Sequence, residues 1–394
     1  MLKLSKVYRA IEAKRSLIEN FDNQSISYLN QLIEGCHSLK SIDFDDYNER
    51  VLDSEEEFIG GLATRELSER GLIFDAVESS LISKEDVAEW KKNILEDRIV
   101  FASDGSQIEA DKNLNMFLGA IQVAYFVNFH NREKEAIKDL DFELVLPSEV
   151  SEEEDELRQK IAFERFAKEV RALIDLIKKV SSAQTQKIPI GFFDGSLTIS
   201  FIHNKTLKKK YLGVVSELIE NSEKYRIPIV GYIDTSLASN LTKSLEVVLG
   251  KVNCGKIKIN DATLLKSFMN KWGSRSSYFR YFDKTASDEF NVLSEIGFCY
   301  LKTSSKKSKP SRLEIPYWVY KDGLHDEVIS TVLAECLVGN GYPYSIEVAD
   351  SMAVIRQDEK EVFYKVLQNS LSNQLDLSNK LKSKLIRRKS NVVV

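Results

Sequence analysis

Apolar residues recur every three or four positions from Leu2 to about Trp90, and charged residues stand between them. This spacing places the apolar side chains on one face of a helix. No proline interrupts the chain before Pro147. The pattern predicts a helical N-terminal arm that either packs on the core or contacts a partner helix.

The pattern changes at Arg98. Three short apolar and β-branched runs, IVFASD, FLGAIQVAYFVNF and DFELVLP, are separated by polar turns. This arrangement predicts an antiparallel three-stranded meander. A helical stretch follows from about Ser151 to Val180, and its acidic first turn suits the positive end of the helix dipole.

Further strand-like and helical segments alternate after the meander. IPIGFFDGS and IPIVGYIDTS each read as a buried strand, and SRLEIPYWVY reads as another. The segment from Asp261 to Phe282 is predicted to be helical and then irregular. Helices are predicted over Lys208–Tyr225, Asp326–Leu337, Ser345–Ile355 and Glu359–Arg388. The order of elements is that of a mixed α/β fold.

No internal repeat and no clear linker divides the chain. One catalytic-type domain with extensions is therefore a simpler interpretation than two independent domains. The expected parts are a helical N-terminal extension (1–97), the α/β domain (98–356) and a C-terminal helix with a basic tail (357–394).

Composition excludes several classes of protein. The chain has 394 residues, of which 43% are hydrophobic, with only 6 Pro and 17 Gly, so it has the material for a core and is not a disordered or collagen-like protein. It has no apolar run of membrane-spanning length, and its first residues lack the apolar core of a signal peptide. The four cysteines form no CxxC pair, which argues against a zinc site or a disulfide framework. We expect a cytoplasmic protein without a membrane partner.

The net charge of −5 is not that of a globally basic nucleic-acid-binding protein. Net charge says little about local patches, however. Three basic clusters occur, at 205–210, 302–309 and 380–389. Each is either a solvated face or a local contact surface for a polyanion.

Two Asp-Gly-Ser tripeptides each follow a strand-like run: Asp104 follows IVFAS, and Asp194 follows IPIGFF. A carboxylate at the end of a buried strand, before a glycine that lets the chain turn, lies at the rim of the sheet with backbone room for a phosphate or an ion. One such tripeptide is commonly only a turn. Two in equivalent settings favour a site at the rim.

Carboxylates at a sheet rim suit a particular chemistry. Hydrolysis of a phosphodiester at neutral pH needs a metal-bound hydroxide and compensation for charge on the phosphoryl oxygens, and two Mg²⁺ or Mn²⁺ ions about 4 Å apart supply both. Such hard cations prefer oxygen ligands. The long helix offers Glu164 and Glu169. Glu164 follows Ile161 and Phe163 near the apolar edge and is the preferred candidate, with solvent exposure as the alternative for both.

Two later acids are further candidates. Asp350 lies in an apolar helical segment, EVADSMAVI, where an acid is unusual unless it is paired or bound to a metal. Asp234 follows the strand-like IVGYI, and a cap for the helix that begins near Leu237 is an equally good interpretation.

A P-loop-like segment is a poor nucleotide site. From Gly250 to Lys256 it matches the P-loop pattern, but Ile257 stands where a Mg²⁺-binding Ser or Thr is required. It also follows a helix-like segment and precedes a strand-like one, which reverses the order that a P-loop needs. ATP binding is not expected here.

Taken together, these segments resemble the NurA nuclease family, whose fold is ribonuclease-H-like and whose members process DNA ends. The resemblance is an ordered series from about Arg98 to Arg356: ASDGSQ, the long helix, GFFDGSL, IVGYIDTS, WGSRSSYF, RLEIPYWV and YPYSIEVADSMAVI. Each piece alone is weak, but their order is fairly specific.

The resemblance implies metal ligands at Asp104, Glu164 and Asp194, with Asp350 completing the site. A common form of the family carries His after Ala where this chain has Asp350, and many members carry a Lys-containing motif where this chain has Asp234. Aspartate is an acceptable ligand for a hard cation, so these departures are compatible with activity.

Three residues of the resembling segments suit DNA contact. The guanidinium of Arg275 can donate two parallel hydrogen bonds to a phosphate, and Tyr342 and Tyr344 can stack on an unpaired base. The competing interpretations are a salt bridge for Arg275 and packing for the two tyrosines.

The leading hypothesis is a metal-dependent DNA nuclease that uses two Mn²⁺ or Mg²⁺ ions, acting as a 5′–3′ exonuclease or an endonuclease on single- and double-stranded DNA. The resemblance further implies a homodimer that docks on a hexameric HerA-type ATPase during DNA end processing. The alternative is a catalytically weak DNA-end-binding or adaptor subunit of such a complex, including one that defends against foreign DNA. A phosphatase or nucleotidase that uses the same acids is a third hypothesis.

Overall fold

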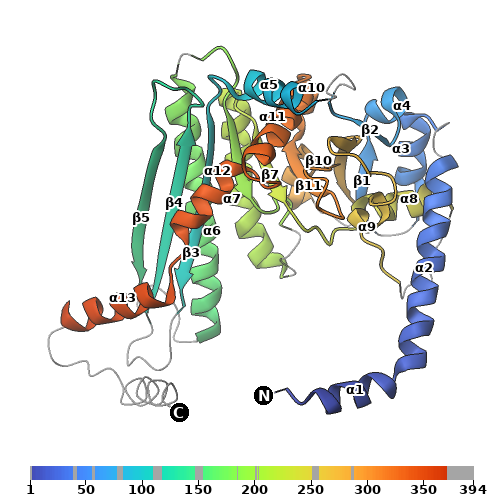
Figure 1. Ribbon diagram of the computed structural model, residues 1–394, viewed down its shortest axis with the longest axis horizontal. Helices are drawn as coiled ribbons and strands as arrows, with labels where there is room; N and C mark the ends of the chain where they lie inside the picture. The colour runs from blue at the N-terminus through green and yellow to red at the C-terminus, as the bar shows by residue number, and fades with distance from the viewer. Residues whose placement is uncertain are drawn as a thin grey trace. The chain divides into compact units, whose positions relative to one another are not determined.

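The computed structural model describes residues 2–38, 42–55, 58–77, 83–109, 118–146, 154–183, 185–199, 202, 204–250, 257–284 and 288–370 (Figure 1). The basic cluster at 380–389, the last part of the predicted C-terminal helix and most of the P-loop-like segment lie outside these residues. The chain forms two compact units. The first unit comprises residues 1–90 and 232–341, and the second comprises residues 91–231 and 342–394.

The predicted meander forms the centre of the second unit. Strands β3 (Val100–Ile108), β4 (Gly119–Asn128) and β5 (Ile137–Val145) pair antiparallel, with Ser103 opposite Tyr125 in the register of β3 and β4. Strand β6 (Ile190–Asp194) pairs parallel to β3, and β7 (Ile229–Ile233) follows β6 in the strand order. The sheet is therefore mixed, as the sequence predicts.

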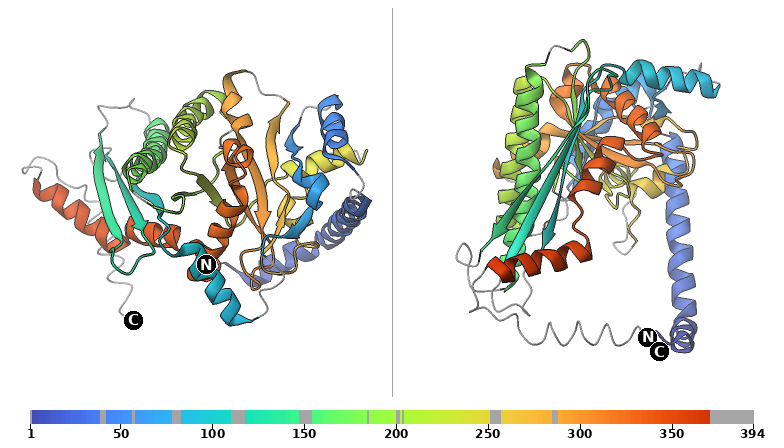
Figure 2. Two further views of the ribbon diagram at one scale, coloured as in Figure 1. Left: turned by 90° about the horizontal axis from the view of Figure 1, so that it is seen from above. Right: turned by 60° about the vertical axis from the view of Figure 1, so that its left-hand side comes forward.

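Helices cover both faces of this sheet. Helices α6 (Glu154–Ser181) and α7 (Lys205–Tyr225) lie on one face, and α12 (Tyr344–Ala353) lies on the other (Figures 1 and 2). The side chain of Asn204 caps α7 by accepting a hydrogen bond from the Leu207 amide at 3.0 Å. Helix α13 (Gln357–Ser370) places Phe363 against Phe142 of β5.

The first unit begins with the predicted helices α1 (Leu4–Glu12), α2 (Arg15–Ser38) and α3 (Phe44–Asp53), and α4 (Glu66–Arg70) follows. Helix α5 (Lys84–Leu95) begins in the first unit and ends in the second. The expectation of helix throughout this region was wrong at two places, because β1 (Ile59–Ala63) and β2 (Ile73–Asp75) interrupt it. Strand β1 pairs with β9 (Phe279–Asp283), more than 200 positions later. Such long-range pairing leaves no periodic signal in a five-residue segment.

The rest of the first unit continues this sheet. Its strand order is β1-β9-β10-β11, with β10 at Ile296–Leu301 and β11 at Ser311–Pro316. The predicted helical-then-irregular segment contains α9 (Asp261–Leu265), β8 (Ser274–Ser276) and β9, and β2 pairs with β8. The predicted strand SRLEIPYWVY is a strand only in its first half, because its second half forms α10 (Tyr317–Lys321). Three further elements complete the unit: α8 (Asn240–Val248), the 3₁₀ helix η3 (Asp288–Glu295) and α11 (His325–Val338).

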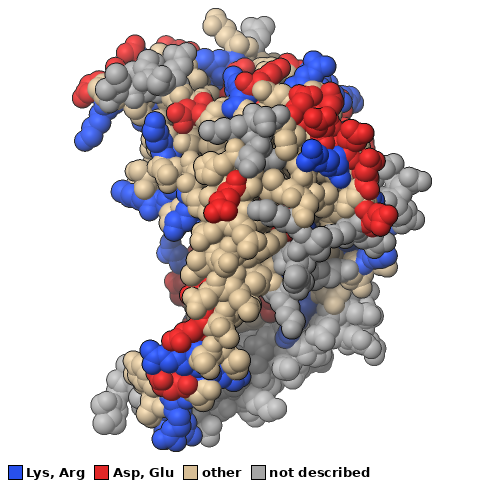
Figure 3. Space-filling model, turned by 90° about the vertical axis from the view of Figure 1, so that its right-hand side faces the viewer, with Lys and Arg blue, Asp and Glu red and all other residues tan. Residues whose placement is uncertain are grey.

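Helix α1 and the first half of α2, together called the arm, expose large apolar side chains. Leu4 and Tyr8 on α1 are 64% and 68% exposed, and Leu17 and Phe21 on α2 are 68% and 56% exposed. Figure 3 faces the side of the molecule on which α2 lies, and it shows a band of uncharged surface that ends in a group of charged side chains. Exposed apolar patches of this kind mark interaction surfaces.

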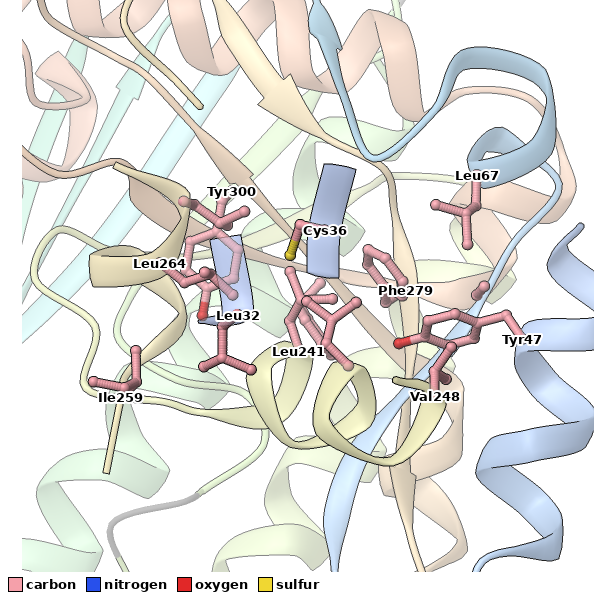
Figure 4. Packing of buried hydrophobic residues seen from close by; sticks show 14 of the residues in the cluster. Leu32, Cys36, Tyr47, Leu67, Leu241, Val248, Ile259, Leu264, Phe279 and Tyr300 are labelled. Carbon is pink, nitrogen blue, oxygen red and sulfur yellow. The ribbon is translucent and has the colours of Figure 1, made fainter. Parts of the chain in front are cut away.

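The core of the first unit joins helices to the strands of its sheet. Leu32 of α2, Tyr47 of α3 and Leu241 of α8 pack around Phe279 of β9 and Tyr300 of β10, and all five are fully buried (Figure 4). This apolar cluster fixes the second half of α2, so the arm extends from a well-packed base. Among the described helices, none is both long enough and apolar enough to cross a bilayer.

Candidate functional site

Asp104 lies inside β3 rather than after it, because β3 continues to Ile108. Side chains alternate between the two faces of a strand. Ser103 faces α6, since its hydroxyl donates to the Glu169 carbonyl at 2.8 Å. The Asp104 carboxylate therefore points to the other face, where Asp350 of α12 lies within hydrogen-bonding reach of it.

Gly105 does not turn the chain, although the sequence suggests that it does. It allows the Glu169 side chain to approach the β3 backbone closely. A Cβ atom at this position would lie 2.5 Å from Oε1 of Glu169. The absence of a side chain lets the Glu169 carboxylate rest against the β3 backbone. Arg165, one helical turn earlier, donates to both the Gly105 carbonyl (2.9 Å) and Oε1 of Glu169 (2.7 Å), and so holds the carboxylate there.

The structure thus separates the two candidate acids of the long helix. Glu169 is buried and interacts electrostatically with Asp104 and Asp194. Glu164 is half-buried. Glu169, the second choice from sequence, is the acid of α6 whose carboxylate lies against the β3 backbone at Gly105 and whose pKa is raised in part by the charge of Asp104. The i, i+4 spacing of Arg165 and Glu169 was a signal that could have indicated this pair.

Asp194 ends β6, as predicted, and Gly195 turns the chain with φ at +144°. The Asp194 side chain is exposed, and it accepts a hydrogen bond from the Tyr342 hydroxyl at 2.6 Å. Tyr344 instead packs edge-on against Phe126, with ring centroids 5.9 Å apart. Of the two tyrosines, Tyr342 belongs to the acid cluster and Tyr344 to the packing of α12.

Burial and mutual repulsion make these acids hard to ionise together. The pKa of Asp104 is raised to about 6 by burial and by the neighbouring charges of Asp194 and Asp350, against a lowering contribution from the Gly105 amide. Burial likewise raises the pKa of Glu169 to about 8, although Arg165 opposes the rise. An excess of negative charge in a partly buried site is what a bound cation would relieve. All four carboxylates are hard oxygen donors, so their chemistry fits Mg²⁺ or Mn²⁺.

The remaining strand-end acid, Asp234, is not a helix cap. Its carboxylate forms an ion pair with Lys307 and lies 3.3 Å from the hydroxyls of Ser311 and Tyr232. The amides at the start of α8 are capped instead by Asp261, which accepts hydrogen bonds from Leu241 and Thr242. Lys307 is part of the basic cluster at 302–309, so one of its cations is internally paired.

Arg275 is fully buried in the first unit, and its guanidinium bridges Glu66 and Asp326. This arrangement is the salt bridge that sequence analysis offered as the alternative to DNA contact for Arg275. The buried guanidinium is not accessible to a DNA phosphate in this arrangement. Burial alone would raise the pKa of Glu66, but hydrogen bonds from His325 and Arg275 outweigh it and lower the pKa to about 2. Sequence analysis did not identify Glu66 or His325, because Glu66 lies 209 positions from Arg275 and 259 from His325 along the chain.

Glu66, His325 and Asp326 also have the spacing of metal ligands. Among the residues that the structure describes, theirs is the group whose ligand atoms all lie within 4.8 Å of one another. Both Glu66 oxygens and one Asp326 oxygen are already hydrogen-bonded to Arg275. A divalent cation would have to displace a buried guanidinium, so the four acids of the second unit are the better metal candidates.

Comparison with known proteins adds independent information. The family model described as the NurA domain matches residues 98–355. The solved NurA nuclease from Sulfolobus solfataricus is 14% identical and superposes with a TM-score of 0.50, covering 95% of this chain and 99% of that chain. A second NurA structure is 9% identical (TM-score 0.44, 77% of this chain and 99% of that chain). The catalytic domain of human endonuclease V is 13% identical (TM-score 0.32, 73% and 99%). No curated protein sequence matches the chain.

The likeness to the Sulfolobus solfataricus structure extends over nearly the full length of both chains and shows a shared fold. The predicted architecture, a mixed sheet flanked by helices, is confirmed. The family model covers well over half of the 394 residues, including the segments that contain Asp104, Glu169, Asp194 and Asp350. The chain therefore belongs to the NurA family.

Proposed function

We propose that this protein is a metal-dependent DNA nuclease. One observation carries the proposal: carboxylates from four separate elements interact around Asp104, in the middle of β3 in the second unit. Asp104 comes from β3, Glu169 from α6, Asp194 from the end of β6 and Asp350 from α12. Membership of the NurA family supports DNA as the substrate.

Asp104, Asp194 and Asp350 would hold the metal ions, together with Glu169 in place of the first-choice Glu164. Two divalent cations bound there would supply a hydroxide nucleophile and neutralise charge on the phosphoryl oxygens.

Two neighbouring side chains have positioning roles in this proposal. Arg165 fixes the Glu169 carboxylate against the β3 backbone through its paired hydrogen bonds. The Tyr342 hydroxyl orients Asp194. Since Tyr342 is half-buried, its ring can also contact an unpaired base next to the cleaved bond.

The test is cleavage of end-labelled single- and double-stranded DNA by the purified chain in Mn²⁺, in Mg²⁺ and in EDTA. We expect cutting with at least one metal and none in EDTA. Asp104→Ala serves as the control for contaminating nucleases, and it should bind DNA while cutting none. Labels at the 5′ and 3′ ends report whether digestion is exonucleolytic in the 5′–3′ direction or endonucleolytic.

Gly105→Ala is a sharper test of the site geometry. The added Cβ would force the Glu169 carboxylate away from the β3 backbone, since 2.5 Å is far below a van der Waals contact. We expect cleavage to fall by about tenfold or more, the loss typical when the support of a metal ligand is disturbed. Thermal denaturation should show a folded protein. Normal cleavage by the folded variant would contradict the placement of Glu169 in the site.

The proposed partners are DNA, a second copy of this chain and a hexameric HerA-type ATPase that supplies translocation, with a cytoplasmic location and a role in DNA end processing in repair or defence. The exposed arm supports a protein partner, because Leu4, Tyr8, Leu17 and Phe21 offer an apolar surface.

The homodimer can be tested through the arm. A Leu17→Glu, Phe21→Glu variant should shift the mass measured by light scattering from that of a dimer to that of a monomer, because it places charge on an apolar contact. Lys14→Glu in the same region is the control for a change of charge alone. A dimer that survives the double substitution would place the contact elsewhere and leave the arm for the ATPase.

A folded chain that cuts DNA under none of these conditions, even with its ATPase partner, would favour the adaptor hypothesis. Intact biological function in Asp104→Ala would point the same way.

A further inference from the structure

A cleft lies entirely within the first unit. It has a volume of about 640 Å³, in the range of small-molecule sites. Its walls come from α3, β1, α4, β9, α10 and the start of α11. None of the four acids of the proposed metal site lines it.

One wall of the cleft is aromatic. Tyr317 and Tyr320 of α10 lie nearly parallel, with ring centroids 5.9 Å apart and an interplanar angle of 12°. The buried ring of Tyr278 lies parallel behind Tyr320 at 5.2 Å, which fixes that ring in place. The His325 ring lies 4.8 Å from Tyr320. Arg280 and Lys321 lie over the Tyr317 ring, 4.7 and 5.5 Å from its centroid. Aromatic rings flanked by cations at the edge of a cleft suit contact with the planar base of a phosphorylated nucleotide.

Cations surround this wall. Four basic side chains line the cleft: Arg65, Arg70, Arg280 and Lys321. Arg70 pairs with Asp326, and Arg280 pairs with Glu295. Within the described part of the chain, Arg65 and Lys321 take part in no ion pair, and both are exposed. The Lys321 ammonium lies over the Tyr317 ring. Neither Arg65 nor Lys321 has an acidic partner among the described residues, so both charges can attract an anionic ligand.

The acids of the cleft do not cancel this attraction. Glu66 is neutralised by the buried Arg275, and Asp326 is shared between Arg275 and Arg70. Glu69 is the remaining lining acid, and it is exposed.

His325 adds a hydrogen-bonding group to the lining of the cleft. Its Nε2 atom lies 2.8 Å from Oε1 of Glu66, which requires a proton on Nε2. Its Nδ1 atom is buried and has no hydrogen-bond partner among the described residues. In the neutral ring, Nδ1 is therefore an acceptor, of the kind that an exocyclic amino group or a sugar hydroxyl satisfies.

We propose that this cleft binds a phosphorylated nucleotide, with its base against Tyr317 and Tyr320 and its phosphate at Arg65 and Lys321. The nucleotide is either a free mononucleotide or one unit of a single DNA strand, and both present the same chemistry. The site is distinct from the carboxylate cluster, and it does not depend on cleavage by that cluster.

The experiment is isothermal titration of the full chain in EDTA with dAMP, with deoxyadenosine and with inorganic phosphate. We expect dAMP to bind more tightly than either fragment. In Arg65→Glu, Lys321→Glu its affinity should fall by more than about tenfold, because two phosphate-facing charges are reversed. Lys243→Glu, an exposed lysine of α8 in the same unit, is the matched control and should bind as the unaltered chain does.

A second measurement separates the two sources of the nucleotide. A single strand that carries 5-iododeoxyuridine is photocrosslinked to the chain in EDTA, and the crosslinked peptide is mapped. Crosslinking to the peptide that contains Tyr317 and Tyr320, reduced in the double variant, assigns the site to a DNA strand. Binding of dAMP without this crosslink assigns it to a free nucleotide.

Absence of both dAMP binding and this crosslink would overturn the proposal, as would equal binding by the double variant. Asp104→Ala should leave both signals unchanged, so failure of the nuclease proposal is distinguishable from failure of this one.

Discussion

Glu169→Gln is expected to reduce DNA cleavage by about a thousandfold, whereas Glu164→Gln should change it by less than about threefold. The two residues lie on the same helix and undergo the same loss of charge. Glu169 is the buried one of the two, and its pKa is raised in part by the charges of Asp104 and Asp194. Initial rates of cutting in saturating Mn²⁺ measure the difference.

The amide of Glu169→Gln keeps the shape of the side chain and can still accept a hydrogen bond from Arg165. Its thermal midpoint should therefore remain close to that of the unaltered chain, and the loss should be one of catalysis. Equal losses in the two variants, or a larger loss in Glu164→Gln, would return the ligand role to the residue that the sequence favours.

Arg275→Met is expected to lower the free energy of unfolding by about 3–5 kcal/mol, the cost of breaking a buried ion pair. The guanidinium is fully buried, and it donates to both oxygens of Glu66 and to Asp326. Its removal leaves a buried carboxylate with fewer partners. Equilibrium urea unfolding measures the loss.

Arg70→Met is the matched control for this prediction. Arg70 also pairs with Asp326, and like Arg275 it lies over the Phe74 ring, but its side chain is 45% exposed. Exposed pairs contribute about 1 kcal/mol or less. Glu66→Gln in the Arg275→Met background should recover part of the stability, since it removes the unpaired charge. A loss in Arg275→Met no larger than in Arg70→Met would contradict a structural role and reopen DNA contact for Arg275.

The elements that could be predicted from sequence are those whose signals are local. The alternation in IVFASD and its two neighbours predicts β3, β4 and β5, because side chains point to opposite faces at every second position. The pattern of residues 208–225 similarly predicts most of α7. Strands β1 and β8 could not be found in this way, since each is short and is stabilised by partners far along the chain.

The same division applies to the site. Asp104 and Asp194 stand out in the sequence because each closes an apolar run and precedes a glycine. Their glycines nevertheless do different things: Gly195 turns the chain at positive φ, while Gly105 leaves room for Glu169. A tripeptide pattern cannot separate these two uses, because only a neighbouring element shows what a Cβ atom would meet.

Composition, periodicity and motif order are properties of the chain alone, and they were sufficient to predict the mixed α/β class, the two strand-borne aspartates and the family. Only the folded chain shows that Glu169, and not Glu164, is buried against β3. Glu164 and Glu169 are five positions apart, so they point about 140° apart around the helix axis. Which of them meets β3 depends on how packing rotates α6 against the sheet. Packing likewise buried Arg275 with Glu66, because only the folded chain brings α4 to β8.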